Sequence, residues 1–138
     1  MEALGGSLIK LLSAPAIIYL HGELGTGKTT LVRGALRSLG YAAAVKSPTF
    51  TLVESYFFPA FNVHHFDLYR ISDPEELEFI GFREYLNDQS IIFIEWPQRG
   101  TRIIPMPTVE LSMFHADSCR RVEIGKNPAI LKKIQEIY

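Results

Sequence analysis

Residues 16–40 read AIIYLHGELGTGKTTLVRGALRSLG, and this stretch decides the fold. The apolar run from Ala16 to Leu20 is short enough to be a buried strand. From Lys28 onward, apolar residues recur at helical spacing until Gly40, which is placed to end the helix in a left-handed conformation. Because a glycine-rich turn lies between them, the stretch predicts a strand, a loop and a helix in direct succession.

The turn at residues 22–29, GELGTGKT, fits the phosphate-loop pattern G-x-x-x-x-G-K-[ST]. Between a strand and a helix, its backbone N–H groups and the positive helix end can surround a phosphate. We expect Lys28 to reach the β- and γ-phosphates of a nucleotide and the Thr29 hydroxyl to bind Mg²⁺. The alternative is a chance Lys-Thr after an ordinary glycine turn, which the position of the loop disfavours.

Catalysis at such a loop needs a carboxylate near the metal, usually at the end of a second buried strand. Glu95 follows the apolar run 91–94, which is the Walker B arrangement. Asp67 ends a weaker run, 63–67, that two histidines interrupt. Each acid could instead be a strand-end carboxylate bonded to a neighbouring loop, but the phosphate loop favours a role for at least one.

The two histidines, His64 and His65, suggest a metal site at first sight. Adjacent residues of a strand point to opposite faces, so the pair cannot chelate one ion together. We therefore expect structural roles for both. Arg120 and Arg121 could place positive charge on a nucleotide, although paired arginines at the start of a strand usually face solvent.

The rest of the chain mixes hairpins with strand–helix units. Residues 49–56 and 62–69 are rich in β-branched and aromatic residues and predict one hairpin, and 109–114 with 121–124 predict a second. We expect further helices at 4–12, from 74 to a break at Gly81, at 82–86 and from 128 onward, and a buried strand at 90–95. The predicted fold is an α/β P-loop NTPase fold, with a mixed sheet flanked by helices in a single domain, 1–138.

The composition is that of an ordinary globular domain of 138 residues, 47% apolar and 21% charged. Its net charge of −1 gives no general field that would draw the chain onto nucleic acid or an anionic membrane. No apolar stretch approaches the roughly 20 residues that span a bilayer, and no signal peptide is visible. With Cys119 as the single cysteine, these features predict a cytoplasmic protein without a membrane anchor.

Five blocks together are more specific than the phosphate loop alone: GELGTGKTT at 22–30, KSPTFTLVE at 46–54, HFDLYR at 65–70, DPEELE at 73–78 and IEWP at 94–97. In this order and combination they closely resemble the TsaE family, also called YjeE. The resemblance runs from residue 16 to about residue 125 and therefore covers most of the chain.

This resemblance implies a bacterial P-loop ATPase that uses ATP and Mg²⁺. The family is required for making threonylcarbamoyladenosine beside the anticodon of tRNAs, the modification written t(6)A37. It acts with TsaD and TsaB, which transfer the threonylcarbamoyl group. Because the chain is nearly neutral, we expect it to meet tRNA indirectly, through those partners.

Carried over position by position, the resemblance implies specific site residues. Asp67 and Glu95 would be the functional acids, Thr29 and Glu95 would hold the metal, and 47–49 would be a switch-like segment. The implied nucleotide-binding residues are Glu23, Leu24, Gly25, Thr26, Gly27, Lys28, Thr29, Thr30, Thr49, Asp67 and Arg120.

Three other functions share the phosphate loop. A small-molecule or nucleotide kinase would need an acceptor site and usually an arginine-rich lid, for which 138 residues leave little room. A GTPase would show an Asn-Lys-x-Asp segment, which the sequence lacks. The third is a nucleotide-gated assembly switch, in which ATP binding matters and hydrolysis is incidental.

Overall fold

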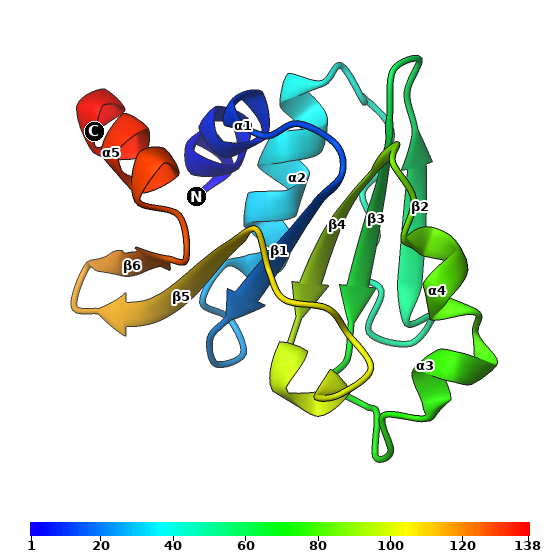
Figure 1. Ribbon diagram of the computed structural model, residues 1–138. Helices are drawn as coiled ribbons and strands as arrows, with labels where there is room; N and C mark the ends of the chain where they lie inside the picture. The colour runs from blue at the N-terminus through cyan, green and yellow to red at the C-terminus, as the bar shows by residue number, and fades with distance from the viewer.

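The computed structural model describes the whole chain, residues 1–138 (Figure 1). Its helices are α1 (Glu2–Leu11), α2 (Lys28–Ser38), α3 (Glu76–Phe79), α4 (Phe82–Tyr85), the 3-10 helix η1 (Pro97–Gly100) and α5 (Pro128–Ile137). Its strands are β1 (Ala16–His21), β2 (Val53–Phe57), β3 (Asn62–Asp67), β4 (Ser90–Glu95), β5 (Val109–Ala116) and β6 (Cys119–Gly125).

All six strands lie in one mixed sheet in the order β2-β3-β4-β1-β5-β6. The four central strands are parallel, and antiparallel hairpins place β2 and β6 at the two edges. Glu95 pairs in register with Leu20 on one side and with Asp67 on the other. Both acids therefore lie at the edge of the sheet where β1 enters the phosphate loop, and the predicted fold class is confirmed.

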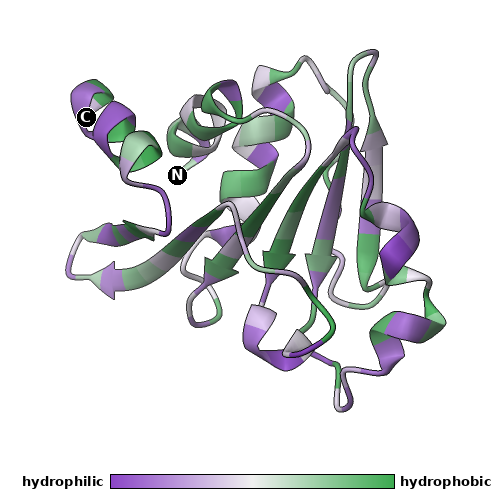
Figure 2. Cartoon of the chain, in the orientation of Figure 1, coloured by the Kyte–Doolittle hydropathy of each residue, from purple (hydrophilic) through white to green (hydrophobic).

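Alternate residues of the central strands face two separate cores. On one face, Ile18 and Phe93 pack with apolar residues of α1, α2 and α5. On the other face, Phe66 packs with Leu77 of α3 and Phe82 of α4. Figure 1 shows the three longer helices grouped apart from α3 and α4, and Figure 2 shows β1 and β4 as hydrophobic over most of their length. Strands β3 and β4 are thus buried on both faces, as is usual in parallel sheets, whereas β1 and β5 alternate between buried and partly exposed residues.

Helices α1 and α2 touch through their backbones at two glycines. A Cβ on Gly5 would lie 1.9 Å from the carbonyl oxygen of Leu31, and a Cβ on Gly34 would lie 2.1 Å from that of Glu2. This approach carries the side chain of Met1 against Gly27, at the end of the phosphate loop. The start of the chain is therefore packed beside the loop.

The first hairpin differs from its prediction. Residues 49–56 were expected as one strand, but β2 begins only at Val53. Residues 49–52 form a turn in which the Leu52 N–H donates to Pro48 O at 2.7 Å and Leu52 has a φ of 73°. Within this turn, the Thr49 side chain donates a hydrogen bond to Asp67, a long-range contact that favours the turn over a longer strand.

Other boundaries move by one or two residues. The strand expected at 62–69 ends at Asp67, the one at 121–124 runs from Cys119 to Gly125, and the helix expected at 4–12 is Glu2–Leu11. Gly40 follows α2 with a φ of 90°, and Gly81 separates α3 from α4, as predicted. None of the helices combines the length and the apolar character needed to cross a membrane.

Candidate functional site

The phosphate loop connects the end of β1 to the start of α2. Gly27 directly precedes the helix with a φ of 106°, a conformation that residues with side chains rarely adopt. Within the loop, the Thr26 hydroxyl donates to Glu23 O at 2.8 Å. Because no side chain caps α2, the N–H groups of its first turn are available to an anion.

Lys28 is the first residue of α2 and is only 5% exposed. Its Nζ donates to Gly22 O at 2.5 Å and to Glu23 O at 2.9 Å, and it lies 4.9 Å from the centre of the Trp96 ring. Burial lowers the pKa of Lys28, against the opposing effect of nearby carboxylates, of which Glu95 has the largest. The ammonium group of Lys28 is thus partly dehydrated within the site.

Two acids at the ends of adjacent strands each bind one threonine. Thr29 Oγ1 donates to Glu95 Oε2 at 3.0 Å, and Thr49 Oγ1 donates to Asp67 Oδ2 at 3.0 Å. Asp67 is 5% exposed and Glu95 3%. Hydrogen bonds to carboxylates are strong at such low exposure, so the two pairs fix the loop that carries Thr29 and the turn that carries Thr49.

The turn around Thr49 leads from the site to the surface. Ser47 Oγ lies 2.8 Å from Thr49 Oγ1, which extends the hydrogen-bond chain away from Asp67. Phe50 follows directly and is 82% exposed, with the guanidinium of Arg70 4.2 Å from the centre of its ring. An aromatic side chain is therefore presented to solvent beside the two acids.

A cavity of about 250 Å³ lies among these groups. Its lining combines residues of the phosphate loop, the turn and the ends of β3 and β4: Leu24, Gly25, Gly27, Lys28, Thr29, Thr30, Ser47, Thr49, Asp67, Glu95 and Trp96. The structure therefore brings together most of the residues expected from the sequence. Of the others, Glu23 and Thr26 bond to each other within the loop.

Arg120 lies at the edge of the site, at the start of β6. Its Nη2 is 3.4 Å from Gly25 O, and the His115 ring on β5 is 3.5 Å from Leu24 O. Both bonds are long and exposed, so they are weak. The second hairpin nevertheless reaches the phosphate loop, and Arg120 is its nearest cationic group.

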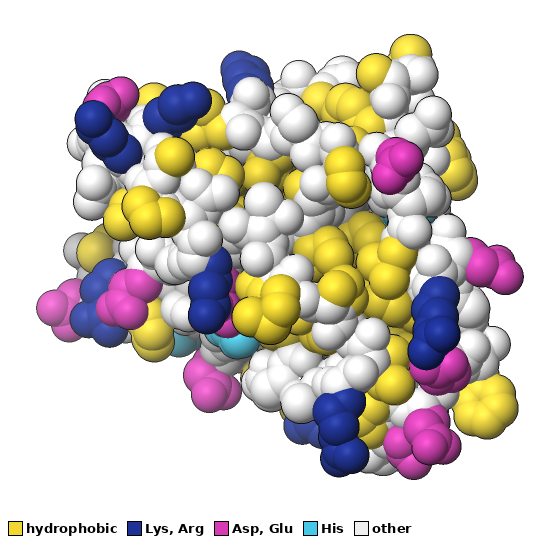
Figure 3. All heavy atoms as spheres, in the orientation of Figure 1, with side chains coloured by type: hydrophobic (Ala, Val, Ile, Leu, Met, Phe, Trp, Pro, Cys, Tyr) yellow, Lys and Arg dark blue, Asp and Glu magenta, His cyan; other side chains and the backbone are white.

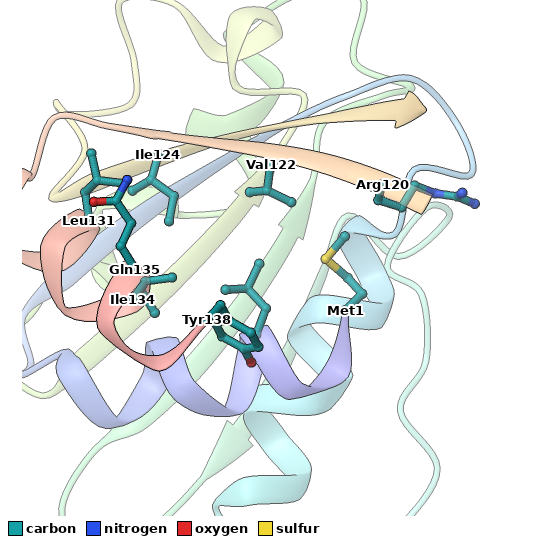
Figure 4. A pocket seen from close by; sticks show the side chains of 9 residues that line it. Met1, Arg120, Val122, Ile124, Leu131, Ile134, Gln135 and Tyr138 are labelled. Carbon is teal, nitrogen blue, oxygen red and sulfur yellow. The ribbon is translucent and has the colours of Figure 1, made fainter. Parts of the chain in front are cut away.

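A second and larger cavity, about 750 Å³, lies apart from the predicted site. It is a groove between α1, β6 and α5, and Figure 4 shows Arg120 and Met1 at one end of it. Seven of its nine lining residues are apolar, which suits neither a phosphate nor a metal ion. Its lining residues are Met1, Leu4, Arg120, Val122, Ile124, Leu131, Ile134, Gln135 and Tyr138.

The sequence did not assign His65 to the site. Its Nε2 lies 2.5 Å from Glu95 Oε2, whereas Nδ1 of the adjacent His64 lies 2.7 Å from Ser55 Oγ. The two histidines thus have separate partners, as their adjacency predicts. Trp96, in the left-handed region with a φ of 56°, is a second unassigned residue of the cavity, and its place directly after the strand-end acid was the available signal.

The donor set limits the ways in which a metal could be held. No group of three or more His, Cys, Asp or Glu side chains in the chain could hold an ion by itself. Thr29 gives its proton to Glu95, so the lone pairs of its oxygen remain available to a cation. The residues therefore fit an ion held jointly by protein and phosphate oxygens, the usual mode for Mg²⁺.

A strand, a phosphate loop and a helix that begins at a buried lysine, beside acids at two neighbouring strand ends, define an α/β protein with the P-loop fold. Residues 1–122 match the family described as Threonylcarbamoyl adenosine biosynthesis protein TsaE. The chain belongs to this family, which takes part in tRNA threonylcarbamoyladenosine biosynthesis.

The relatives of this chain include several proteins named tRNA threonylcarbamoyladenosine biosynthesis protein TsaE. The Haemophilus influenzae protein is 48% identical over 127 residues, which cover 87% of this chain and 80% of that protein. The Rickettsia prowazekii protein is 37% identical over 107 residues, or 77% of this chain and 74% of that protein. The crystal structure of Bacillus subtilis YdiB superposes with a TM-score of 0.76, covering 99% of this chain and 85% of that one at 22% identity, and it supports the fold.

Proposed function

We propose that this chain binds ATP with Mg²⁺ and hydrolyses it slowly, in support of tRNA threonylcarbamoyladenosine formation by a TsaB–TsaD complex. The observation that carries the proposal is the pair of buried acids, Asp67 and Glu95, each bonded to one threonine beside Lys28. This arrangement combines a cation and a helix start for phosphates with carboxylates for a hydrated metal ion.

Lys28 and the start of α2 would hold the phosphates. A buried ammonium loses less binding energy to water than an exposed one, because its hydration is already reduced. The first N–H groups of α2 add donors that α2 itself leaves free. Together they favour a polyphosphate over a single carboxylate or sulfate.

Thr29 and Glu95 would hold Mg²⁺, Thr29 directly and Glu95 directly or through a water. The ion would neutralise charge on the phosphates during transfer to water. Asp67 would be the second functional acid, because it also lines the cavity and accepts a hydrogen bond from Thr49 in the turn that borders it. Arg120 would approach the nucleotide from the second hairpin.

A partner would complete the site. The turn around Thr49 contributes Ser47 and Thr49 to the lining of the cavity and reaches the surface at the exposed Phe50. A protein docked there would exclude water and hold the turn against the nucleotide. Family membership supports TsaD and TsaB as those partners.

The charges of the chain support indirect contact with tRNA. On the face shown in Figure 3, Lys and Arg side chains are scattered among Asp and Glu and form no continuous basic surface. Such a surface lacks the clustered cations that phosphate backbones require. With one free cysteine, Cys119, we also propose a cytoplasmic location.

The test is steady-state ATP hydrolysis by the chain alone, with TsaB and TsaD, and with tRNA alone, each with and without Mg²⁺. We expect slow Mg²⁺-dependent turnover that rises on addition of the protein pair. Stimulation by tRNA alone would favour a direct RNA-dependent enzyme. If the partners promote ATP binding without any turnover, the assembly switch would replace the ATPase.

A further inference from the structure

The two oxygens of the Glu95 carboxylate have different surroundings. Oε2 accepts two hydrogen bonds, from Thr29 Oγ1 at 3.0 Å and from His65 Nε2 at 2.5 Å. A carboxylate oxygen has two lone pairs, so Oε2 is fully used. Oε1 has no protein donor, and Glu95 lines the cavity. Oε1 is therefore the atom that this residue offers to a bound group.

The sheet places His65 where it can hold the Glu95 carboxylate in this orientation. It is two residues before Asp67 on β3 and therefore on the same face, and its register partner is Phe93, two residues before Glu95. The ring is completely buried. Its position is set by the backbone pairing of two central strands and does not depend on the phosphate loop.

The second ring nitrogen of His65 settles where the proton lies. Nδ1 is buried and has no hydrogen-bond partner. A proton there would be a buried donor without an acceptor, whereas a proton on Nε2 meets the carboxylate of Glu95. His65 thus donates to Glu95 through Nε2. An apolar residue would fill the same space without an unpartnered nitrogen, so the bond to Glu95 is what compensates for a polar ring at this position.

We propose that His65 is the positioning residue of Glu95: by donating to Oε2, it holds the carboxylate against Thr29 with Oε1 directed to the magnesium ion or its water. This inference rests on the proposed function, since it needs a metal–nucleotide complex at the site. Groups that orient a metal-binding carboxylate typically change metal affinity or activity by about 10-fold to 100-fold when they are removed.

The chain offers a matched control in the next residue. His64 is also buried, bonds to Ser55 and packs against the Tyr85 ring on the opposite face of the sheet. Replacing it should disturb packing to a similar degree without touching Glu95. If a variant loses Mg²⁺ affinity or activity only because β3 is disturbed, the loss would appear in the variants of both His64 and His65.

The experiment compares His65→Leu, His65→Gln, His65→Asn and His64→Leu with the parent chain. Gln can place an N–H near the position of Nε2, whereas the shorter Asn cannot reach Glu95. The readouts are the Mg²⁺ concentration that half-saturates the Trp96 fluorescence change with ATP, the ATP affinity without Mg²⁺, kcat and KM, and thermal unfolding.

We expect His65→Leu and His65→Asn to raise the half-saturating Mg²⁺ concentration by about 10-fold or more and to lower kcat more than they raise KM. For His65→Gln, the half-saturating Mg²⁺ concentration should lie within about threefold of the parental value. ATP affinity without Mg²⁺ should be unchanged in all three His65 variants. His64→Leu should unfold at lower temperature and keep the parental Mg²⁺ dependence.

Parental Mg²⁺ dependence in folded His65→Leu or His65→Asn would overturn the inference and leave the proposed function standing. If His65→Leu does not fold, the comparison of His65→Asn with His65→Gln decides. Equal half-saturating Mg²⁺ concentrations in these two variants would also overturn the inference. Absence of any Mg²⁺-dependent ATP signal in the parent chain would instead remove the proposed function.

Discussion

At the ends of β3 and β4, one face of the sheet carries acidic side chains and the other carries apolar ones. On the face toward α2, the last residues of the strands are Asp67 and Glu95, and both carboxylates accept hydrogen bonds. On the other face, Phe66 and Ile94 are completely buried in the core formed with α3 and α4. Neighbouring residues of one strand thus serve a polar site and an apolar core.

This difference shows that the same strand register places both the acids of the site and the apolar residues packed against α3 and α4. A shift of one residue in β3 would exchange Phe66 with Asp67 and lose both. The apolar face holds the strands in place, and the polar face can then carry charged groups at low exposure. The following changes separate the two faces, because each alters one of them and leaves the other intact.

The largest effect is expected on the apolar face. Phe66→Ala removes a completely buried ring that contacts the rings of Phe82 and Tyr85, and it should lower the free energy of unfolding by about 3–5 kcal/mol. Chemical denaturation measures this loss. ATP affinity of the folded fraction should stay within about threefold of the parent, since no site contact is removed. A large affinity change would mean that the faces are not separable.

Lys28→Ala tests the polar face at its centre. The cation that would neutralise the phosphates is lost, so the dissociation constant for ATP should rise about 100-fold or more. Titration followed by Trp96 fluorescence gives this value, and circular dichroism checks the fold. Lys10→Ala, an exposed lysine on α1, is the charge-matched control and should bind normally. Unchanged affinity in Lys28→Ala would refute the phosphate-loop assignment.

Glu95→Gln and Asp67→Asn keep the shape of the acids and remove their charge. Both should reduce hydrolysis by about 10-fold to 100-fold and ATP binding by much less, because the charge around the metal matters most in the transition state. Single-turnover hydrolysis separates the two quantities. The exposed Glu123→Gln serves as reference. Parental turnover in both variants would require a different pair of acids.

The smallest effect concerns pH and the face away from the site. Burial lowers the pKa of His64 below its ordinary value of 6.5. The unfolded chain therefore takes up a proton that the folded chain resists, and stability falls as the pH drops below 6.5. Between about pH 7 and pH 5.5, the loss should be at most about 1 kcal/mol larger in the parent than in His64→Gln. Equal pH profiles would contradict the burial argument.

Local patterns predicted the parts of the fold that depend on near neighbours in the chain. The strand, loop and helix of residues 16–40 and the acid at the end of β4 need only periodicity and spacing. The turn at residues 49–52 was missed because its β-branched and aromatic composition favours a strand, while the competing bond joins Thr49 to Asp67, far along the chain.

The role of His65 could not be predicted for a similar reason. The sequence shows two adjacent histidines in an apolar run, and nothing local distinguishes one from the other. Only the parallel register of β3 and β4 brings His65 to Glu95, which is 30 positions further along the chain. The alternation of side chains along a strand excludes a metal ion shared by His64 and His65, but it does not identify the hydrogen-bond partner of either histidine.

The backbone contact between α1 and α2 reverses the usual expectation for helix engineering. In most helices, replacing an interior glycine by alanine gains up to about 1 kcal/mol through helix propensity and reduced chain entropy. At Gly5 and Gly34 the added methyl group would overlap a backbone oxygen of the opposite helix, so the helices would have to separate. Because Met1 rests on Gly27, such a separation would also disturb the phosphate loop. A consensus or thermostability design that scores each helix alone would therefore select two substitutions that damage both packing and the loop.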